Sequence, residues 1–160
     1  MGKKIKIQSL VSGIVIVKDD TLRLRREWKN KGAIQIIDSD DLDILLYDPG
    51  VEYMFRQGVL DFVDEAEGKK FKIDFGWEQP GEEPEVIRVD DDLMREMMTE
   101  MNIADFRKQV KKLTKEQLFE LTRFCIENNY TQYEKVEILK QATDVDIINT
   151  IRLTKEDTSK

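Results

Sequence analysis

The spacing of apolar residues changes once along this chain, and this change constrains the fold more than any other feature. In the first third, apolar and polar side chains alternate, as in IKIQSLVSGIVIV and GAIQII, which is typical of half-buried strands. After Val89, apolar residues recur every third or fourth position, which is typical of amphipathic helices. We therefore expect an α+β protein, with a small N-terminal β unit carrying inserted short helices and a C-terminal bundle of four or five short helices.

Turn and cap residues divide the chain further. We expect a hairpin turn at Ser12–Gly13, a helix that begins with Ser39 as its N-cap, a strand in VLDFVD and a further strand in KKFKIDFGW. The polar stretch EQPGEEPE is the best candidate for a linker. The resulting organisation is a β-rich unit at 1–64 with a helix-turn-helix insertion at 38–58, a strand and acidic linker at 65–89, a helical bundle at 90–154 and a frayed tail at 155–160.

The stretch YDPGVEYMFRQG reads as a structural turn that needs no ligand. Pro49 and Gly50 follow Asp48, so the first helix ends there, and Asp48 then caps a second helix that starts at Pro49. Gly58 suits the left-handed position after the end of that second helix.

The helical half carries two further kinds of signal. Thr114 with Gln117 and Thr131 with Glu134 have the spacing of capping boxes. The four methionines at i, i+3, i+4 and i+7 favour core packing over an adaptable partner surface, and Cys125, at a helical apolar position, is expected to be a buried structural thiol. The methionines are Met94, Met97, Met98 and Met101.

Missing residue types exclude several chemistries within the chain. It has no histidine and one cysteine, which excludes Ser-His-Asp and Cys-His catalysis, Cys/His zinc sites and an intrachain disulfide. No glycine-rich phosphate-binding loop has the required spacing. The acidic clusters at 38–43 and 90–92 lack the spacing of a calcium loop, so we interpret them as helix starts. We expect a non-enzymatic protein without metal or cofactor.

Charge is distributed unevenly along the N-terminal half. Residues 1–37 hold nine Lys/Arg and three Asp/Glu, whereas residues 38–64 hold one Arg and eight acids. Either the two segments form complementary contact faces of a subunit, or they neutralise each other within the fold. The candidate interaction residues are Arg23, Arg25, Arg26, Trp28, Lys29, Lys31, Asp38, Asp40, Asp41 and Asp43.

Two basic stretches also raise the alternative of nucleic-acid binding. RLRREWKNK combines five basic residues with a tryptophan, a composition that suits phosphate contact and base stacking. A pI near 4.8 argues against DNA as the main partner, so a solvated or protein-binding strand face is the favoured interpretation. For RKQVKKLTK, at 107–115, we favour an ordinary charged helix face.

No apolar run reaches the length of a membrane span, and polar residues interrupt the apolar stretch near the N-terminus. That stretch therefore favours a strand over a signal peptide. These observations favour the cytoplasm as the location, with no membrane partner.

Four stretches of the chain resemble uncharacterised short proteins of tailed bacteriophages and prophages. They are LRLRREW, KGAIQI, SDDLDILLYDPGVEYMFRQGVLDF and the helical LTKEQLFELTRFCIENNYTQYEKVEILKQAT. The resemblance implies a virion or assembly component, located in the virion or the host cytoplasm, and it assigns no catalytic residue. We expect partners among phage structural proteins or further copies of the chain, in a homo-oligomer. The alternative is a small regulatory protein that binds a host protein or nucleic acid through the basic N-terminal strand.

Overall fold

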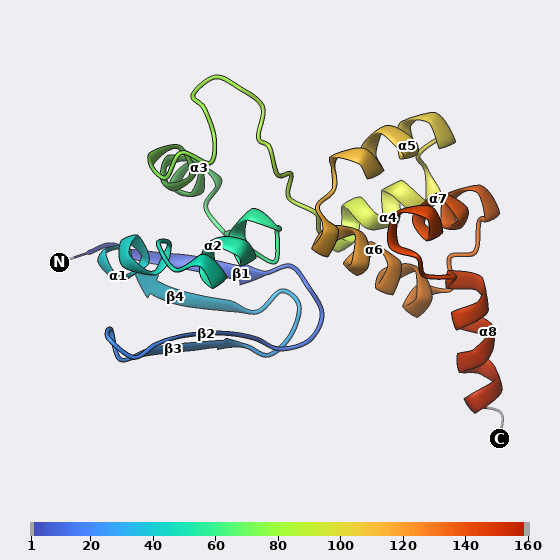
Figure 1. Cartoon of the computed structure of the whole chain (residues 1–160), viewed down its shortest axis with the longest axis horizontal. Coiled ribbons are helices and arrows are strands. Elements are labelled where there is room, and N and C mark those ends of the chain that lie inside the picture. Colours follow the sequence, from blue (N-terminus) through green and yellow to red (C-terminus); the bar gives the residue numbers. More distant parts are fainter. Residues whose placement is uncertain (1, 159–160) are drawn as a thin grey trace. The chain divides into compact units, whose positions relative to one another are not determined.

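The computed structural model describes residues 2–158, which form two compact units, Met1–Arg88 and Val89–Lys160 (Figure 1). The first unit contains all five strands of the described chain and three helices, and the second contains five helices. The expected α+β class is confirmed. None of the described helices is both long and apolar enough to span a lipid bilayer.

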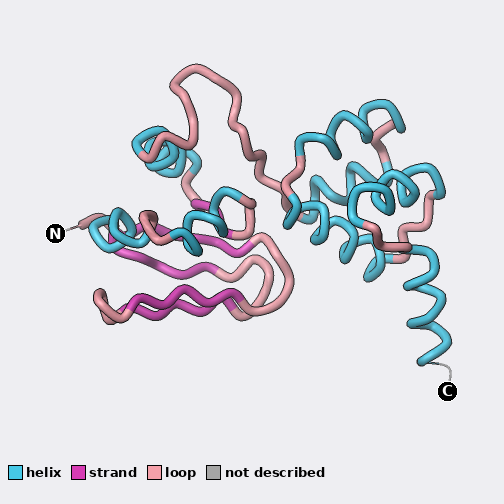
Figure 2. Tube along the Cα trace, viewed as in Figure 1, coloured by secondary structure: helices cyan, strands magenta, loops and turns pink. Residues whose placement is uncertain are grey.

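Two small antiparallel sheets build the first unit (Figure 2). One has the order β4-β1-β5, from Ile34–Asp38, Lys4–Ser9 and Leu60–Phe62, and the other pairs β2 (Val15–Asp19) with β3 (Leu24–Trp28). The expected hairpin at Ser12–Gly13 is wrong, because β1 pairs with β4 and β5 and not with β2. The end of β1 is hydrogen-bonded to the residues just before β4 and β5, since Ser9 N donates to Ala33 O and Leu10 N donates to Val59 O.

Side chains fasten the β2–β3 hairpin to the other sheet. Arg26 Nε donates to Ile36 O and Gln35 Nε2 donates to Glu27 O, both at 2.9 Å. Trp28 donates its indole N–H to Ile7 O at 2.9 Å and is fully buried. Inward residues of both sheets therefore share one core with the apolar sides of the two helices that follow β4.

These helices are α1 (Ser39–Leu45) and α2 (Pro49–Arg56). The N-cap of α1 is Asp38, not the expected Ser39, because the Asp38 carboxylate accepts from Asp40 N at 2.9 Å. The second cap is confirmed: the Asp48 carboxylate accepts from the N–H groups of Gly50 and Val51. Gly58 follows α2 with φ of 78°, the expected left-handed conformation.

The segment after β5 is helix α3 (Glu65–Asp74), so the strand expected in KKFKIDFGW is wrong. Asp64 caps this helix by accepting from Glu67 N at 3.0 Å. Gly68 lets α3 lie close to β5, because a Cβ at this position would be 2.8 Å from the Cβ of Phe62. The polar stretch 78–85 has neither helix nor strand, as a linker requires.

The helices of the second unit are α4 (Asp91–Thr99), α5 (Ile103–Lys112), α6 (Lys115–Asn128), α7 (Tyr133–Thr143) and α8 (Ile147–Thr158). Helix α6 packs against α4, α7 and α8, and α5 packs against α7. Met94, Met97, Met98 and Cys125 are buried and Met101 is half-buried, which confirms core roles for the methionines and the thiol.

Helix ends in this unit match the sequence signals in part. Thr114 and Gln117 form the expected capping box of α6. The second box is wrong, because α7 begins after Gln132 and has no side-chain cap bond. The expected tail is helical as far as Thr158, and its last two residues lie outside the described part of the chain.

Candidate functional site

The predicted basic strand does not present its charges on one face. Arg25 is exposed and pairs with Glu27 at 3.4 Å, whereas Arg26 turns toward β4 and is half-buried. Arg23 lies in the turn before β3 with φ of 50°, and Lys29 is exposed beyond the end of the strand. The alternation of a strand therefore separates these cations.

Trp28 cannot stack on a ligand, because it is fully buried and its indole N–H is bonded within the core. Its place in the predicted interaction surface is therefore wrong. The prediction fails because tryptophan has the largest apolar side chain, and the small sheet gains most stability by burying it in the core. Lys31 is half-buried in the connection to β4 and has interactions of its own.

The predicted acidic residues gather at the start of α1. Asp38 caps the helix, and Asp40 and Asp41 lie in its first turn, where carboxylates meet unpaired N–H groups. The outward side of α1 and the turn that follows it also carry exposed apolar residues. We call Asp40, Asp43, Ile44 and Tyr47 the acidic α1 face, in which Ile44 is 52% and Tyr47 78% exposed.

An exposed face that combines lysine and isoleucine covers the outer side of the three-stranded sheet. Lys6 on β1 lies directly opposite Ile36 on β4, and Lys4 and Ile34 flank this pair on the same side. Ile34 is 47% and Ile36 44% exposed, although both lie in a strand whose inward Ile37 is buried. We call Lys4, Lys6, Ile34 and Ile36 the lysine–isoleucine face.

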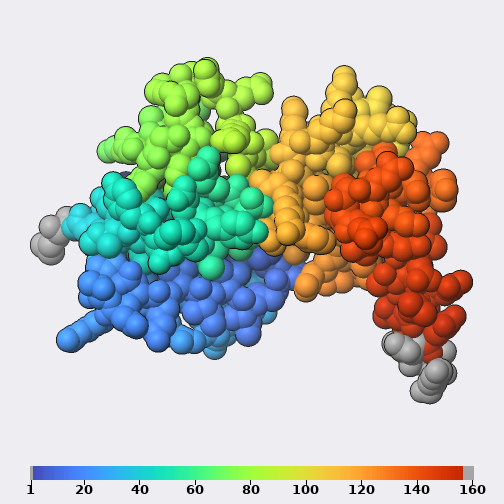
Figure 3. Space-filling model, in the orientation of Figure 1, coloured from blue at the N-terminus to red at the C-terminus, as the bar shows by residue number. Residues whose placement is uncertain are grey.

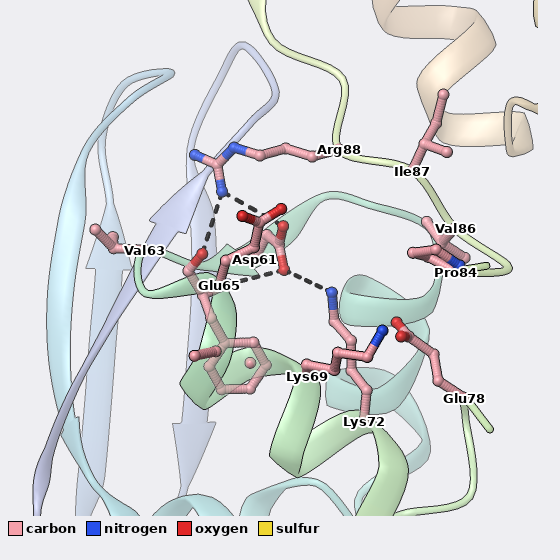
Figure 4. Close-up of a pocket in the computed structure, with 13 residues that line it drawn as sticks. Asp61, Val63, Glu65, Lys69, Lys72, Glu78, Pro84, Val86, Ile87 and Arg88 are labelled. Carbon is pink, nitrogen blue, oxygen red and sulfur yellow. Dashed lines mark hydrogen bonds and ion pairs between the residues drawn. The ribbon is translucent and has the colours of Figure 1, made fainter. Parts of the chain in front are cut away.

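An open pocket of about 900 Å³ lies between β5, α3 and the segment 84–88 (Figure 4). At its edge the Asp61 carboxylate pairs with Lys72 at 3.0 Å and with Arg88 at 3.4 Å. Arg88 also donates to Phe62 O at 3.2 Å and to the Gln8 side chain.

This arrangement is a clasp that holds the end of the linker against β1 and β5. Both oxygens of Asp61 accept from cations, so the carboxylate is engaged in structure. The other charged residues of the pocket are Glu65, Lys69 and Glu78, whose signs are mixed. Mixed, solvent-facing charges give the pocket no marked preference for an anion or a cation.

The second unit contains one buried ammonium group. Lys135 is 1% exposed, donates to Met97 O at 2.6 Å and lies 5.4 Å from the centre of the Phe106 ring. Burial lowers the pKa of Lys135 below its ordinary value of 10.5. No group of three or more metal-ligating side chains occurs among the described residues.

Several of these features gave no usable signal in the sequence. Asp61, Lys72 and Arg88 are far apart in the chain and come together only through tertiary structure. Lys135 precedes an apolar residue of α7 and looks like a surface lysine. The lysine–isoleucine face had a weak signal, because AIQIID places isoleucine at adjacent positions, so that both sides of the strand are apolar.

No protein-family model, no curated protein and no solved structure was found to match this chain.

Proposed function

We propose that the chain is a non-enzymatic structural or assembly subunit of a phage particle, which acts by binding copies of itself or other phage proteins. The observation that carries this proposal is the lysine–isoleucine face, where two half-exposed isoleucines lie beside two exposed lysines. Exposed apolar groups rimmed by charge are typical of protein interfaces. The resemblance to short phage proteins supports a place in a virion or in its assembly in the host cytoplasm.

A second copy of the chain offers a complementary surface. The acidic α1 face has two carboxylates, from Asp40 and Asp43, beside the exposed side chains of Ile44 and Tyr47. Lysines would meet aspartates and isoleucines would meet Ile44 and Tyr47 if the two faces docked. The two faces are different surfaces of one chain, so the contact would be head-to-tail and would build a ring or a filament.

Sedimentation velocity at low and high salt tests this contact. We expect association at low salt that weakens at high salt, because the charges that align the faces are exposed and screened. Lys4→Glu/Lys6→Glu and Asp40→Lys/Asp43→Lys should each abolish association alone. A mixture of the two variants should associate again, because each reversed face then meets a complementary one.

Lys111→Glu/Lys112→Glu, on α5 of the second unit, is the control, with the same change of net charge as Lys4→Glu/Lys6→Glu at residues that belong to neither face. It should associate like the unchanged chain. A strict monomer at both salt concentrations would overturn self-association. Mass spectrometry of purified particles tests the phage assignment, and absence of the chain from particles and from assembly intermediates would contradict it.

The alternative, regulation through the basic N-terminal strand, has weaker support. Arg26 and Trp28 are engaged in the core, and Arg25 has an acidic neighbour. The other exposed cations of that segment, Arg23 and Lys29, lie beyond opposite ends of β3.

A further inference from the structure

Helix α5 and the first residue of α6 carry a run of exposed cations. Residues 107–115 include five basic residues and no acid. Phe106 and Val110 face the core of the second unit, so the outward positions fall to the cations between them. All five are exposed, and α5, coloured gold, lies at the surface in Figure 3. We call Arg107, Lys108, Lys111, Lys112 and Lys115 the basic patch.

Within the described part of the chain, no member of the basic patch forms an ion pair within 4 Å. Other exposed cations of the same unit do, since Arg95 pairs with Asp92 and Lys140 with Asp146. The nearest acid on α5, Asp105, is bonded to Asn102 at the helix start. Two of the lysines suit the helix dipole, but the dipole favours cations only in the last turn. It therefore does not account for Arg107 and Lys108.

We propose that the basic patch binds the phosphate backbone of single-stranded nucleic acid, a role separate from the self-association described above. A protein partner would need an apolar centre to the contact, but it would find Phe119 only next to the basic patch, because the exposed side chains of α5 itself are charged except for Ala104. A polyanion needs only the charges. Lysine and arginine bind phosphates without reading sequence, so the binding should be independent of base order.

An exposed aromatic ring beside the basic patch favours a single strand over a duplex. Phe119 on α6 is 41% exposed, and Lys115 Nζ lies 6.0 Å from the centre of its ring. Arg123, one turn further along α6, is also exposed. An unpaired base can stack on such a ring while its phosphates meet the neighbouring cations. Bases inside a duplex are not available for this contact.

The net negative charge of the whole chain limits the expected affinity of the basic patch for nucleic acid. With a net charge of −7, the protein as a whole repels polyanions, and this repulsion opposes the attraction by the basic patch. Binding should therefore be weak at physiological salt and strong only at low ionic strength.

Fluorescence anisotropy of the full-length chain with a labelled oligothymidylate of about 20 nucleotides tests the proposal. Lys108→Gln/Lys111→Gln/Lys112→Gln should weaken binding about tenfold or more at low salt and reduce the slope of log K against log salt by about 2. Glutamine forms helices well, and circular dichroism would verify that the variant folds. Lys18→Gln/Lys69→Gln/Lys70→Gln, the control with the same loss of charge at exposed positions of the first unit, should bind within about threefold of the unchanged chain.

Phe119→Leu separates stacking from charge. It should weaken binding to the single strand several-fold, leave the salt slope unchanged and have no effect on binding to a duplex. Absence of binding at low salt, or equal loss in both triple variants, would overturn the proposal. So would competition by polyglutamate as effective as that by the oligonucleotide, which would indicate an acidic protein, or tighter binding to the duplex than to the single strand.

Discussion

The buried Nζ atom of Lys135 lies 2.6 Å from the carbonyl oxygen of Met97, in the last turn of α4. That carbonyl lacks its usual partner within the helix, because Met101 N donates to Glu96 O instead. The lysine therefore satisfies a helix end from another helix, α7. Among the described residues, no carboxylate pairs with its charge.

Lys135 should make stability depend on pH at alkaline values. Because burial lowers its pKa, the unfolded chain binds a proton more readily than the native protein between the lowered pKa and the ordinary value of 10.5. The free energy of unfolding contributed by this group therefore rises with pH across that interval. The penalty for burying the charge is fully present at lower pH.

Urea denaturation of the unchanged chain and of Lys135→Met, from neutral pH towards 10.5, measures this contribution. The unchanged chain should gain stability relative to the variant as pH rises. Gln141→Met, at an exposed position of α7, is the control and should give a constant difference, because neither side chain titrates. A constant difference for Lys135→Met as well would show that its burial carries no such penalty.

The clasp at Asp61 should contribute more to stability than a surface ion pair. Asp61→Asn leaves Lys72 and Arg88 without their acid in a site where the Asp61 side chain is 16% exposed. We expect the free energy of unfolding to fall by about 1–3 kcal/mol, with faster hydrogen exchange in residues 84–88. The matched control, Glu52→Gln, removes an exposed pair with Arg56 and should cost no more than about 0.5 kcal/mol. Equal losses of stability in Asp61→Asn and Glu52→Gln would show that the ion pairs of Asp61 contribute no more than an exposed pair.

Gly58 holds a left-handed conformation that a branched side chain resists. Because its φ is 78°, Gly58→Val should lower the free energy of unfolding by about 1 kcal/mol or more. Gly58→Asn should cost less, since asparagine tolerates this region better. Chemical denaturation of the two variants gives the comparison, and equal stabilities would argue against the cap after α2.

The single thiol should be unreactive in the native protein. Burial raises the pKa of Cys125 to about 12, so little thiolate forms near neutral pH. Iodoacetamide should label Cys125 slowly in the folded chain and rapidly in guanidinium chloride. Rapid labelling of the native protein would show that the core of the second unit opens readily.

The parts of the fold that follow from neighbouring residues were predictable from the sequence. Asp48 and Pro49 start α2, and Thr114 with Gln117 starts α6, because a cap bond needs only residues two or three positions apart. The segment that forms α3 was misread, because its apolar residues alternate as in a strand. Phe71 and Phe75 are also four apart, and both pack on the core from one side of a helix.

Strand pairing and the candidate sites could not be predicted from the sequence, because they depend on residues that are far apart in the chain. Which strand pairs with β1 depends on the whole first unit, and no local pattern encodes it. Trp28 was predicted to stack on a ligand because basic residues surround it in the sequence. Its hydrogen bond to Ile7 O, which holds it in the core, cannot be predicted from those neighbours. The neutralisation of a charge by a distant residue, as at Asp61 and Arg88, is likewise visible only in three dimensions.

The position of β1 between β4 and β5 also affects how the protein matures during synthesis. The edge of β1 that faces β4 can pair once Ile34–Asp38 has been synthesised, but the edge that faces β5 stays open until Leu60–Phe62 has followed, about fifty residues after Ser9. Helices of the second unit pack mainly with near neighbours in sequence and can form as they emerge. The first unit is therefore the slower part to fold, and until β5 is made the open edge of β1 can pair with other extended chains.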